Sequence, residues 1–206
     1  MSLVIAFIGS QGAVMAGDMR EILFLGDASC REALEAELYD GRIVTDDALR
    51  RRAAEIGIGV HVRDTKTKVA ERDGILVGEV GETEAGIVRK RRLYASQGNY
   101  AIADFEGDSM TLVSKGTGST FTVLGNAVAK EIANRCIREA WKGGGMAEAV
   151  RTIVFTMQTA ARTTASVSNE YLLVQTPHRK DVVTVLEKDA ARAAAGRGEE
   201  SGSCSG

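Results

Sequence analysis

The chain has 206 residues, of which 44% are hydrophobic, and its formal net charge at pH 7 is −2. A chain of this length and composition can bury one full core. Its small net charge does not indicate a polyanion-binding surface, so we expect no nucleic-acid partner. The sequence has no apolar run of membrane-spanning length and no signal-peptide pattern. We therefore expect a cytoplasmic protein without membrane insertion.

The residues that most often bind metals are few and scattered. Cys30, Cys136 and Cys204 are far apart and do not form a metal-binding motif. Only two histidines are present, His61 and His178, and each is typical of a surface or strand position. We expect reduced thiols, no metal and no cofactor.

The beginning of the chain contains the groups of a nucleophilic centre. Ser2 follows Met1, and a small second residue permits removal of the initiator methionine, which leaves Ser2 with a free α-amine. A hydroxyl beside its own amine is a nucleophile with a built-in base. The ordinary pKa of that amine, roughly 8, suits proton transfer near neutral pH. Met-Ser is also a common start, so this pair alone is not diagnostic.

A predicted β-hairpin brings a carboxylate back toward Ser2. The strand-like run at residues 3–8 leads into the turn Gly9-Ser10-Gln11-Gly12, and a second apolar run at residues 13–16 ends at Gly17-Asp18. If the hairpin is tight, Asp18 returns to the start of the first strand, beside Ser2.

The rest of the chain mixes helical and strand-like segments. We predict helices at residues 31–39, 45–56, 126–141 and 146–164, the first with Ser29 and Glu32 as a capping box. We predict strands at residues 59–62, 67–70, 75–80, 87–95, 100–105, 110–114, 120–124, 171–176 and 182–187. From Ala190 onward Ala, Gly, Ser and Glu dominate, which predicts a disordered tail over residues 190–206.

Several stretches carry a resemblance to a known family. Residues 13–20, Ala-Val-Met-Ala-Gly-Asp-Met-Arg, resemble the second strand of proteasome-like N-terminal nucleophile hydrolases, which ends in an Ala-Ala/Gly-Asp pattern. The chain is more closely similar to the connectases, proteasome homologues of methanogenic archaea. The stretches that match the connectases are residues 13–22, 37–39, 43–46, 78–80, 91–96, 125–126, 164–168 and 174–176. The resemblance covers about residues 2–189.

The resemblance implies an α+β fold, the proteasome-like αββα sandwich of N-terminal nucleophile hydrolases. Its domain would span residues 2–189, with an inserted segment after the first hairpin at about residues 24–87. The two adjacent long helices would form one helical layer. The helices within residues 29–57 would form either a short opposing layer or an inserted lobe. Longer connectases carry an additional C-terminal domain, which we do not expect here.

The resemblance also implies roles for individual residues. Ser2 would be the nucleophile and Asp18 would position it, assisted by a lysine. Lys68 resembles the proteasomal lysine in its sequence setting, and Lys90 in the basic run 89–92 is the alternative. Either could instead be a solvated lysine on a strand. Ser166 and Ser168 match supporting serines of the family, although both residues are also typical of a helix exit.

Connectases are sequence-specific transpeptidases, or protein ligases, and the resemblance implies this activity. The expected substrate is a Lys-Asp-Pro-Gly-Ala type motif, and the expected partner is the motif-bearing subunit of the methanogenic tetrahydromethanopterin S-methyltransferase. Arg20 or the basic run could bind the aspartate of the motif. Ser2 replaces the family's usual Thr and lacks the methyl group that restricts χ1, so we expect a lower ratio of ligation to hydrolysis. An N-terminal nucleophile peptidase or amidase, and a non-catalytic binding module, stay open.

Overall fold

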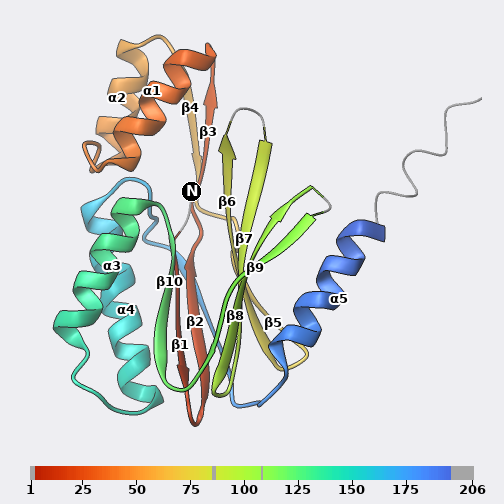
Figure 1. Ribbon diagram of the computed structural model, residues 1–206. Coiled ribbons are helices and arrows are strands. Elements are labelled where there is room, and N and C mark those ends of the chain that lie inside the picture. Colours follow the sequence, from red (N-terminus) through yellow and green to blue (C-terminus); the bar gives the residue numbers. More distant parts are fainter. Residues whose placement is uncertain (1–2, 85–86, 108, 196–206) are drawn as a thin grey trace, which may run out of the picture.

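The computed structural model describes residues 3–84, 87–107 and 109–195. Ser2 and Cys204 lie outside the described residues. The described part contains a four-stranded, a five-stranded and a two-stranded sheet, all antiparallel, and five α-helices (Figure 1).

The four-stranded sheet lies at the centre of the molecule and is built around the first hairpin. Its strands, in spatial order, are β10 (Thr120–Gly125), β1 (Leu3–Gly9), β2 (Gly12–Asp18) and β11 (Tyr171–Thr176). The predicted hairpin is confirmed, because Val4 pairs with Gly17. Every residue of β1 and β2 is buried, as expected for strands that are covered on both faces.

Two long helices cover one face of this sheet. They are α3 (Ala127–Ala140) and α4 (Met146–Thr163). Asn126 caps α3, since its side chain accepts a hydrogen bond from the Ala129 N–H. The helices bury residues such as Ile132 and Ile153 against Ile5 of β1. This layer confirms the two predicted long helices.

The five-stranded sheet packs on the other face of the central sheet. Its strands, in order, are β5 (Val69–Arg72), β6 (Ile75–Glu84), β7 (Ile87–Ser96), β8 (Asn99–Glu106) and β9 (Ser109–Thr117). Val4 and Met15 contribute to the core between the sheets, together with Leu93 of β7. Gly78 permits a close approach here, because a Cβ on it would lie 2.7 Å from Met15 Sδ.

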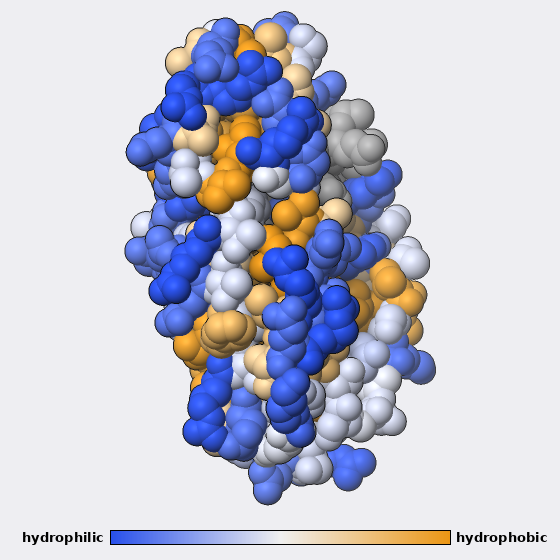
Figure 2. Space-filling model, turned by 90° about the vertical axis from the view of Figure 1, so that its left-hand side faces the viewer, coloured by the Kyte–Doolittle hydropathy of each residue, from blue (hydrophilic) through white to orange (hydrophobic). Residues whose placement is uncertain are grey.

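Residues 21–63 form a separate lobe, shown at the top of Figure 1. It consists of β3 (Glu21–Leu25), α1 (Ala28–Tyr39), α2 (Asp46–Glu55) and β4 (Gly59–Arg63). The helices bury Leu34, Leu38 and Leu49 against the two-stranded sheet. Figure 2 views the face that carries this lobe above α3 and α4, and hydrophilic side chains cover most of it.

The expected αββα sandwich of N-terminal nucleophile hydrolases is wrong for this structure. The molecule has one two-helix layer and two stacked antiparallel sheets, but the far face of the five-stranded sheet carries only one helix, α5, among the described residues. The helices α1 and α2 cannot form the opposing layer, because their apolar faces are buried inside the lobe. The lobe ends before β5 and β6, which were expected in the insertion and which belong to the five-stranded sheet.

Two local predictions are also wrong. Residues 182–187 are not a strand but the start of α5 (Val182–Ala195), which therefore also includes the first residues of the predicted tail. Buried residues at 182, 186 and 189 follow helical spacing. The first helix begins at Ala28, and its cap is Asp27 instead of Ser29. Asp27 accepts hydrogen bonds from two successive main-chain N–H groups.

The described residues lack two further features. None of their helices is both long and apolar enough to cross a bilayer. They also contain no group of three or more His, Cys, Asp or Glu residues placed to hold a metal ion.

Candidate active site

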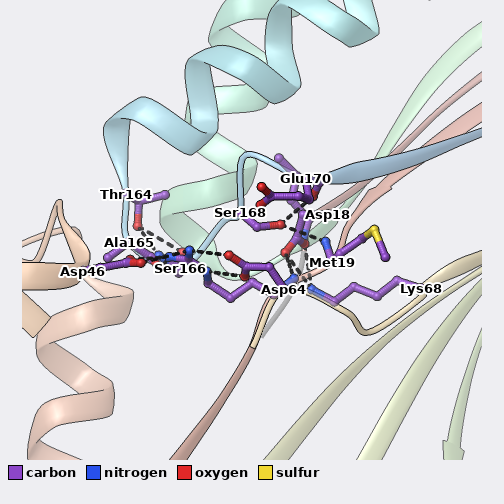
Figure 3. Close-up of polar contacts among 12 residues, drawn as sticks. Asp18, Met19, Asp46, Asp64, Lys68, Thr164, Ala165, Ser166, Ser168 and Glu170 are labelled. Carbon is purple, nitrogen blue, oxygen red and sulfur yellow. Dashed lines mark hydrogen bonds and ion pairs between the residues drawn. The ribbon is translucent and has the colours of Figure 1, made fainter. Parts of the chain in front are cut away.

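A buried ion pair lies where the hairpin meets the five-stranded sheet. The Lys68 ammonium donates to both carboxylate oxygens of Asp18, with Nζ 2.8 Å from Oδ1 and 2.7 Å from Oδ2 (Figure 3). The side chains are 2% and 0% exposed, respectively. Burial lowers the pKa of the Lys68 ammonium below its ordinary value, and the charge of Asp18 partly offsets this effect.

Asp18 also contacts the beginning of β1. The Leu3 N–H donates to Asp18 Oδ1 at 2.6 Å, and the Arg20 N–H donates to Oδ2 at 2.9 Å. Asp18 thus reaches the residue that follows Ser2, as the tight hairpin predicted. Ser2 itself lies outside the described residues. Its proposed role as nucleophile stays a prediction.

Gly17 allows Lys68 to approach the hairpin. A Cβ at this position would lie 2.8 Å from Val69 Cγ1 and 3.3 Å from Lys68 Cβ. A larger residue would therefore push β5, and Lys68 with it, away from Asp18. The glycine before Asp18 is therefore needed for steric reasons, which the sequence pattern alone does not reveal.

Ser168 fixes the backbone next to Asp18. Its hydroxyl accepts a hydrogen bond from the Met19 N–H at 2.9 Å and donates to the Glu170 carbonyl at 2.5 Å (Figure 3). Ser168 is almost completely buried. Ser168 thus lies close to the Asp18–Lys68 pair and holds the residue that follows Asp18.

Ser166 lies in the same loop but has different partners. Its hydroxyl is 3.0 Å from Thr164 Oγ1 and accepts a hydrogen bond from Asn126 Nδ2 at 3.1 Å. Asn126 follows Gly125, which pairs with Leu3 at the end of β10. Ser166 therefore connects the exit of α4 to the strand beside the start of the chain.

The Arg20 guanidinium is enclosed by protein acceptors. Nε and Nη2 donate to the two oxygens of Asp64, each at 2.9 Å. Nη1 and Nη2 donate to Asp46 at 2.5 and 3.2 Å, and Nη1 also donates to the Ala165 carbonyl at 2.7 Å. These five contacts match the five N–H donors of a guanidinium. Burial alone would lower the pKa of Arg20, but the bonds with Asp64 and Asp46 raise it above its ordinary value.

A groove of about 450 Å³ opens beside the start of β1. Its lining is formed by Val80, Gly81, Arg89, Lys90, Arg91, Asp104, Val123, Leu124, Gly125, Asn126, Ala127 and Lys130. It therefore contains four cationic residues and one carboxylate. The groove reaches Gly125, the pairing partner of Leu3, so it lies next to the first residue of β1.

The basic run contributes to the groove, and its charges are partly paired. Arg91 forms two 2.6 Å hydrogen bonds with Asp104, and Arg89 pairs with Glu106 at 2.9 Å. Lys90 lies on the groove wall but pairs with Glu79 at 3.2 Å, so the structure places Lys68 and not Lys90 on Asp18.

Sequence reasoning did not single out Lys130, a cationic residue of the groove. Lys130, half-buried on α3, has no ion-pair partner within 4.0 Å among the described residues. The sequence signal that could have found it is its position: Lys130 lies one helical turn after the Asn126 cap.

Comparison with curated protein sequences gives no match. Among solved structures, the chain is similar to the helical assembly of the Anbu complex from Pseudomonas aeruginosa, with a TM-score of 0.41 and 11% identity, covering 96% of this chain and 95% of the other. Anbu (ancestral beta-subunit) from Yersinia bercovieri gives a TM-score of 0.39 and 7% identity, covering 99% and 98%. Anbu from Hyphomicrobium sp. strain MC1 gives a TM-score of 0.37 and 13% identity, and the match covers 96% of this chain and 94% of the other.

A family model also matches most of the chain. Residues 1–191 match the family model described as "Connectase MJ0548-like, N-terminal domain". The matched region contains the first hairpin, the lobe, Lys68 and the loop with Ser166 and Ser168. The chain belongs to the connectase family.

Proposed function

We propose that the protein is a sequence-specific transpeptidase that uses Ser2 to form an acyl-enzyme, as the resemblance to connectases implied. The observation that carries the proposal is the placement of Asp18. Its buried carboxylate binds the Lys68 ammonium and the Leu3 N–H together. A charged pair this close to the second residue suits the positioning of an N-terminal nucleophile and its amine.

The proposed first step begins with Met1 already removed. The Ser2 hydroxyl oxygen attacks the carbonyl carbon of the aspartate in a Lys-Asp-Pro-Gly-Ala type motif, and the α-amine takes the hydroxyl proton. The Asp–Pro C–N bond then breaks, and the proton passes to the departing proline nitrogen. An ester joins the upstream segment to Ser2. The free Pro-starting fragment leaves.

The second step reverses the first with a new amine. An incoming Pro-starting N-terminus attacks the ester, its nitrogen loses a proton, and the Ser2 oxygen regains one. Ligation requires that this amine reacts faster than water does, so the site must exclude water around the ester. The implied partner is the motif-bearing subunit of tetrahydromethanopterin S-methyltransferase.

We assign recognition of the motif's aspartate to the groove instead of Arg20. All five donors of Arg20 are already used by protein acceptors. The groove offers Arg89, Arg91 and Lys130 next to the start of β1. A carboxylate that enters it exchanges water for charge-assisted hydrogen bonds.

The test uses two peptides that carry the motif and differ in mass, together with mature enzyme. We expect an enzyme adduct of the upstream segment at Ser2 and a mixed peptide that combines halves of the two substrates. Ser2→Ala should form neither product. Ser2→Thr is the matched control, because it keeps the hydroxyl, and it should raise the share of ligated over hydrolysed product.

The alternatives give different products in the same assay. If free acid and free amine accumulate without exchange at about millimolar acceptor, the protein is a peptidase and the transpeptidase proposal fails. If peptide binds but no bond is cleaved, the protein is a binding module.

A further inference from the structure

Arg20 joins three parts of the chain that are far apart in sequence. Its guanidinium contacts Asp46 in the first turn of α2, Asp64 after β4 and the Ala165 carbonyl after α4. The side chain is only 6% exposed. The Arg20 side chain therefore connects three segments: the lobe, the segment that follows the lobe, and the loop that contains Ser166 and Ser168. These contacts are called the Arg20 clamp below.

The backbone of Arg20 acts directly on Asp18. Its N–H donates to Asp18 Oδ2, while the Leu3 N–H donates to the other oxygen. A carboxylate held from both sides cannot rotate without breaking one of these bonds. The orientation of Asp18 therefore depends on where the backbone of residue 20 is held, and the Arg20 clamp determines that position.

The Arg20 clamp also acts on Lys68 through Asp64. Asp64 begins the short segment that leads from the lobe into β5, and Lys68 lies four residues later. Between them, the Lys66 N–H donates to the Met19 carbonyl at 3.0 Å. The two ends of this segment are thus attached to Arg20 and to Asp18, the residues on either side of Met19. A shift of Asp64 would move the backbone from which Lys68 reaches Asp18.

We infer that Arg20 is a positioning residue that aligns both Asp18 and Lys68 and couples their geometry to the lobe of residues 21–63. The inference rests on the proposed transpeptidase function of the same site. Arg20 does not touch the substrate, since its five N–H donors are taken. It acts through the two residues that it holds, so its loss should slow the chemical step and leave peptide binding nearly unchanged.

The experiment compares Arg20→Gln with Arg52→Gln as the matched control. Arg52 forms forked contacts inside the lobe, with two 2.8 Å bonds to Glu37 and one 3.2 Å bond to Glu55; its side chain is 39% exposed, and it does not contact Asp18 or Asp64. Arg20→Gln should lower kcat by about 100-fold and change KM less than about twofold, because small misplacements of catalytic groups are costly. Arg52→Gln should keep kcat.

Two further variants separate positioning from simple loss of charge. Arg20→Lys keeps the charge but cannot make the forked contacts with Asp64 and Asp46, so it should not restore kcat. Asp64→Asn should also lower kcat. In the Arg20→Gln Asp64→Asn double variant, the fold-loss in kcat should be smaller than the product of the two single fold-losses. Circular dichroism and thermal unfolding confirm that each variant is folded at the assay temperature.

The role of Arg20 can be tested even if the protein is not a transpeptidase. Wild-type enzyme that hydrolyses without exchange refutes the transpeptidase, but its kcat still tests Arg20. If no peptide reacts, NMR of the Lys68 side chain replaces kcat: Arg20→Gln should shift its signal and its titration, and Arg52→Gln should not. A normal kcat in Arg20→Gln, a rise in KM alone, or an unshifted Lys68 signal would each overturn the inference.

Discussion

The Lys68 ammonium lies 2.7 Å from Asp18 Oδ2, and both side chains are almost completely buried. Removing both charges from water costs free energy, which a single ion contact rarely offsets. Here each carboxylate oxygen of Asp18 also accepts a hydrogen bond from a main-chain N–H group, which adds to the stabilisation of the buried charge. The described residues contain no buried side-chain nitrogen or oxygen without a hydrogen-bond partner. The pair therefore has hydrogen-bond partners for its buried polar atoms and lies next to the start of β1.

The variant Asp18→Asn tests this network. It keeps the shape of the side chain but loses its charge and one of its two acceptor oxygens, which leaves Lys68 buried without a counter-charge. We expect turnover to fall about 100-fold or more and the free energy of unfolding to fall by about 3–5 kcal/mol. Steady-state kinetics and urea denaturation measure the two effects.

The control for this variant is Asp40→Asn. Asp40 pairs with Arg42 at 2.6 Å, but the two side chains are 47% and 63% exposed. Solvent screens an exposed pair, which therefore contributes little to stability, so Asp40→Asn should change stability little and turnover not at all. Wild-type turnover in a folded Asp18→Asn protein would show that Asp18 does not position the reacting groups.

A second prediction concerns processing of the N-terminus. The proposed mechanism needs a free α-amine on Ser2, and the small Ser2 side chain permits removal of Met1. Intact mass spectrometry of protein made in cells should therefore give a mass lower by one methionine. An active preparation that retains Met1 completely would refute the mechanism, because the amine would then be part of a peptide bond.

The part of the site that could be predicted from sequence is local. The hairpin that returns Asp18 to the start of β1 follows from two short apolar runs and a turn, and the structure confirms it. Pairing of Lys68 with Asp18 is not local, since 50 residues separate them. The resemblance to a family suggested Lys68 over Lys90, and the packing of β5 against Gly17 provides the physical reason.

The errors have physical causes too. Residues 182–187 contain three valines and a threonine, which favour strands, but Asp181 accepts hydrogen bonds from the Val183 N–H and the Thr184 hydroxyl and starts a helix instead. The contacts of Arg20 were missed because its two acidic partners are distant in sequence: Asp46 begins α2, 26 residues after Arg20, and Asp64 follows β4, 44 residues after it. Spacing along the chain contains no information about such a contact.

A third prediction follows from Tyr94, which lies in the core between the five-stranded sheet and α5. Burial and the neighbouring charge of Asp189 raise the pKa of its phenol to about 12, against the opposing effect of Arg92. In the unfolded chain the phenol ionises near pH 10. Folding therefore favours the neutral form, and this contribution is complete below pH 10 and is lost as pH rises from 10 to about 12.

The measurement is the free energy of unfolding across this alkaline range. Wild-type protein should lose on the order of 2 kcal/mol from this group. Tyr94→Phe should be less stable at neutral pH, because Asp189 loses the 3.0 Å hydrogen bond from the phenol, but its stability should depend less steeply on pH above 10. Equal slopes for the two proteins would contradict the assignment.

The last prediction concerns Lys130 in the groove. Arg89 and Arg91 already pair with Glu106 and Asp104, so a substrate carboxylate must compete for them. Lys130 has no such ion pair among the described residues, and it lies on the same groove. We expect Lys130→Gln to raise KM for a motif peptide by about tenfold, the scale of one hydrogen bond to a charged group. The value of kcat should stay nearly constant, because Lys130 acts on binding of the aspartate and not on the buried ion pair.

Two controls separate a direct contact of Lys130 with the carboxylate from a role in shaping the groove. Lys142→Gln should behave as wild type, since Lys142 is exposed beyond the end of α3 and outside the groove. A peptide with asparagine in place of the motif's aspartate should bind wild-type and Lys130→Gln protein equally weakly. High salt should narrow the difference between the two proteins for the aspartate peptide, because exposed charges are screened. An equal loss of affinity for both peptides would show that Lys130 shapes the groove without contacting the carboxylate.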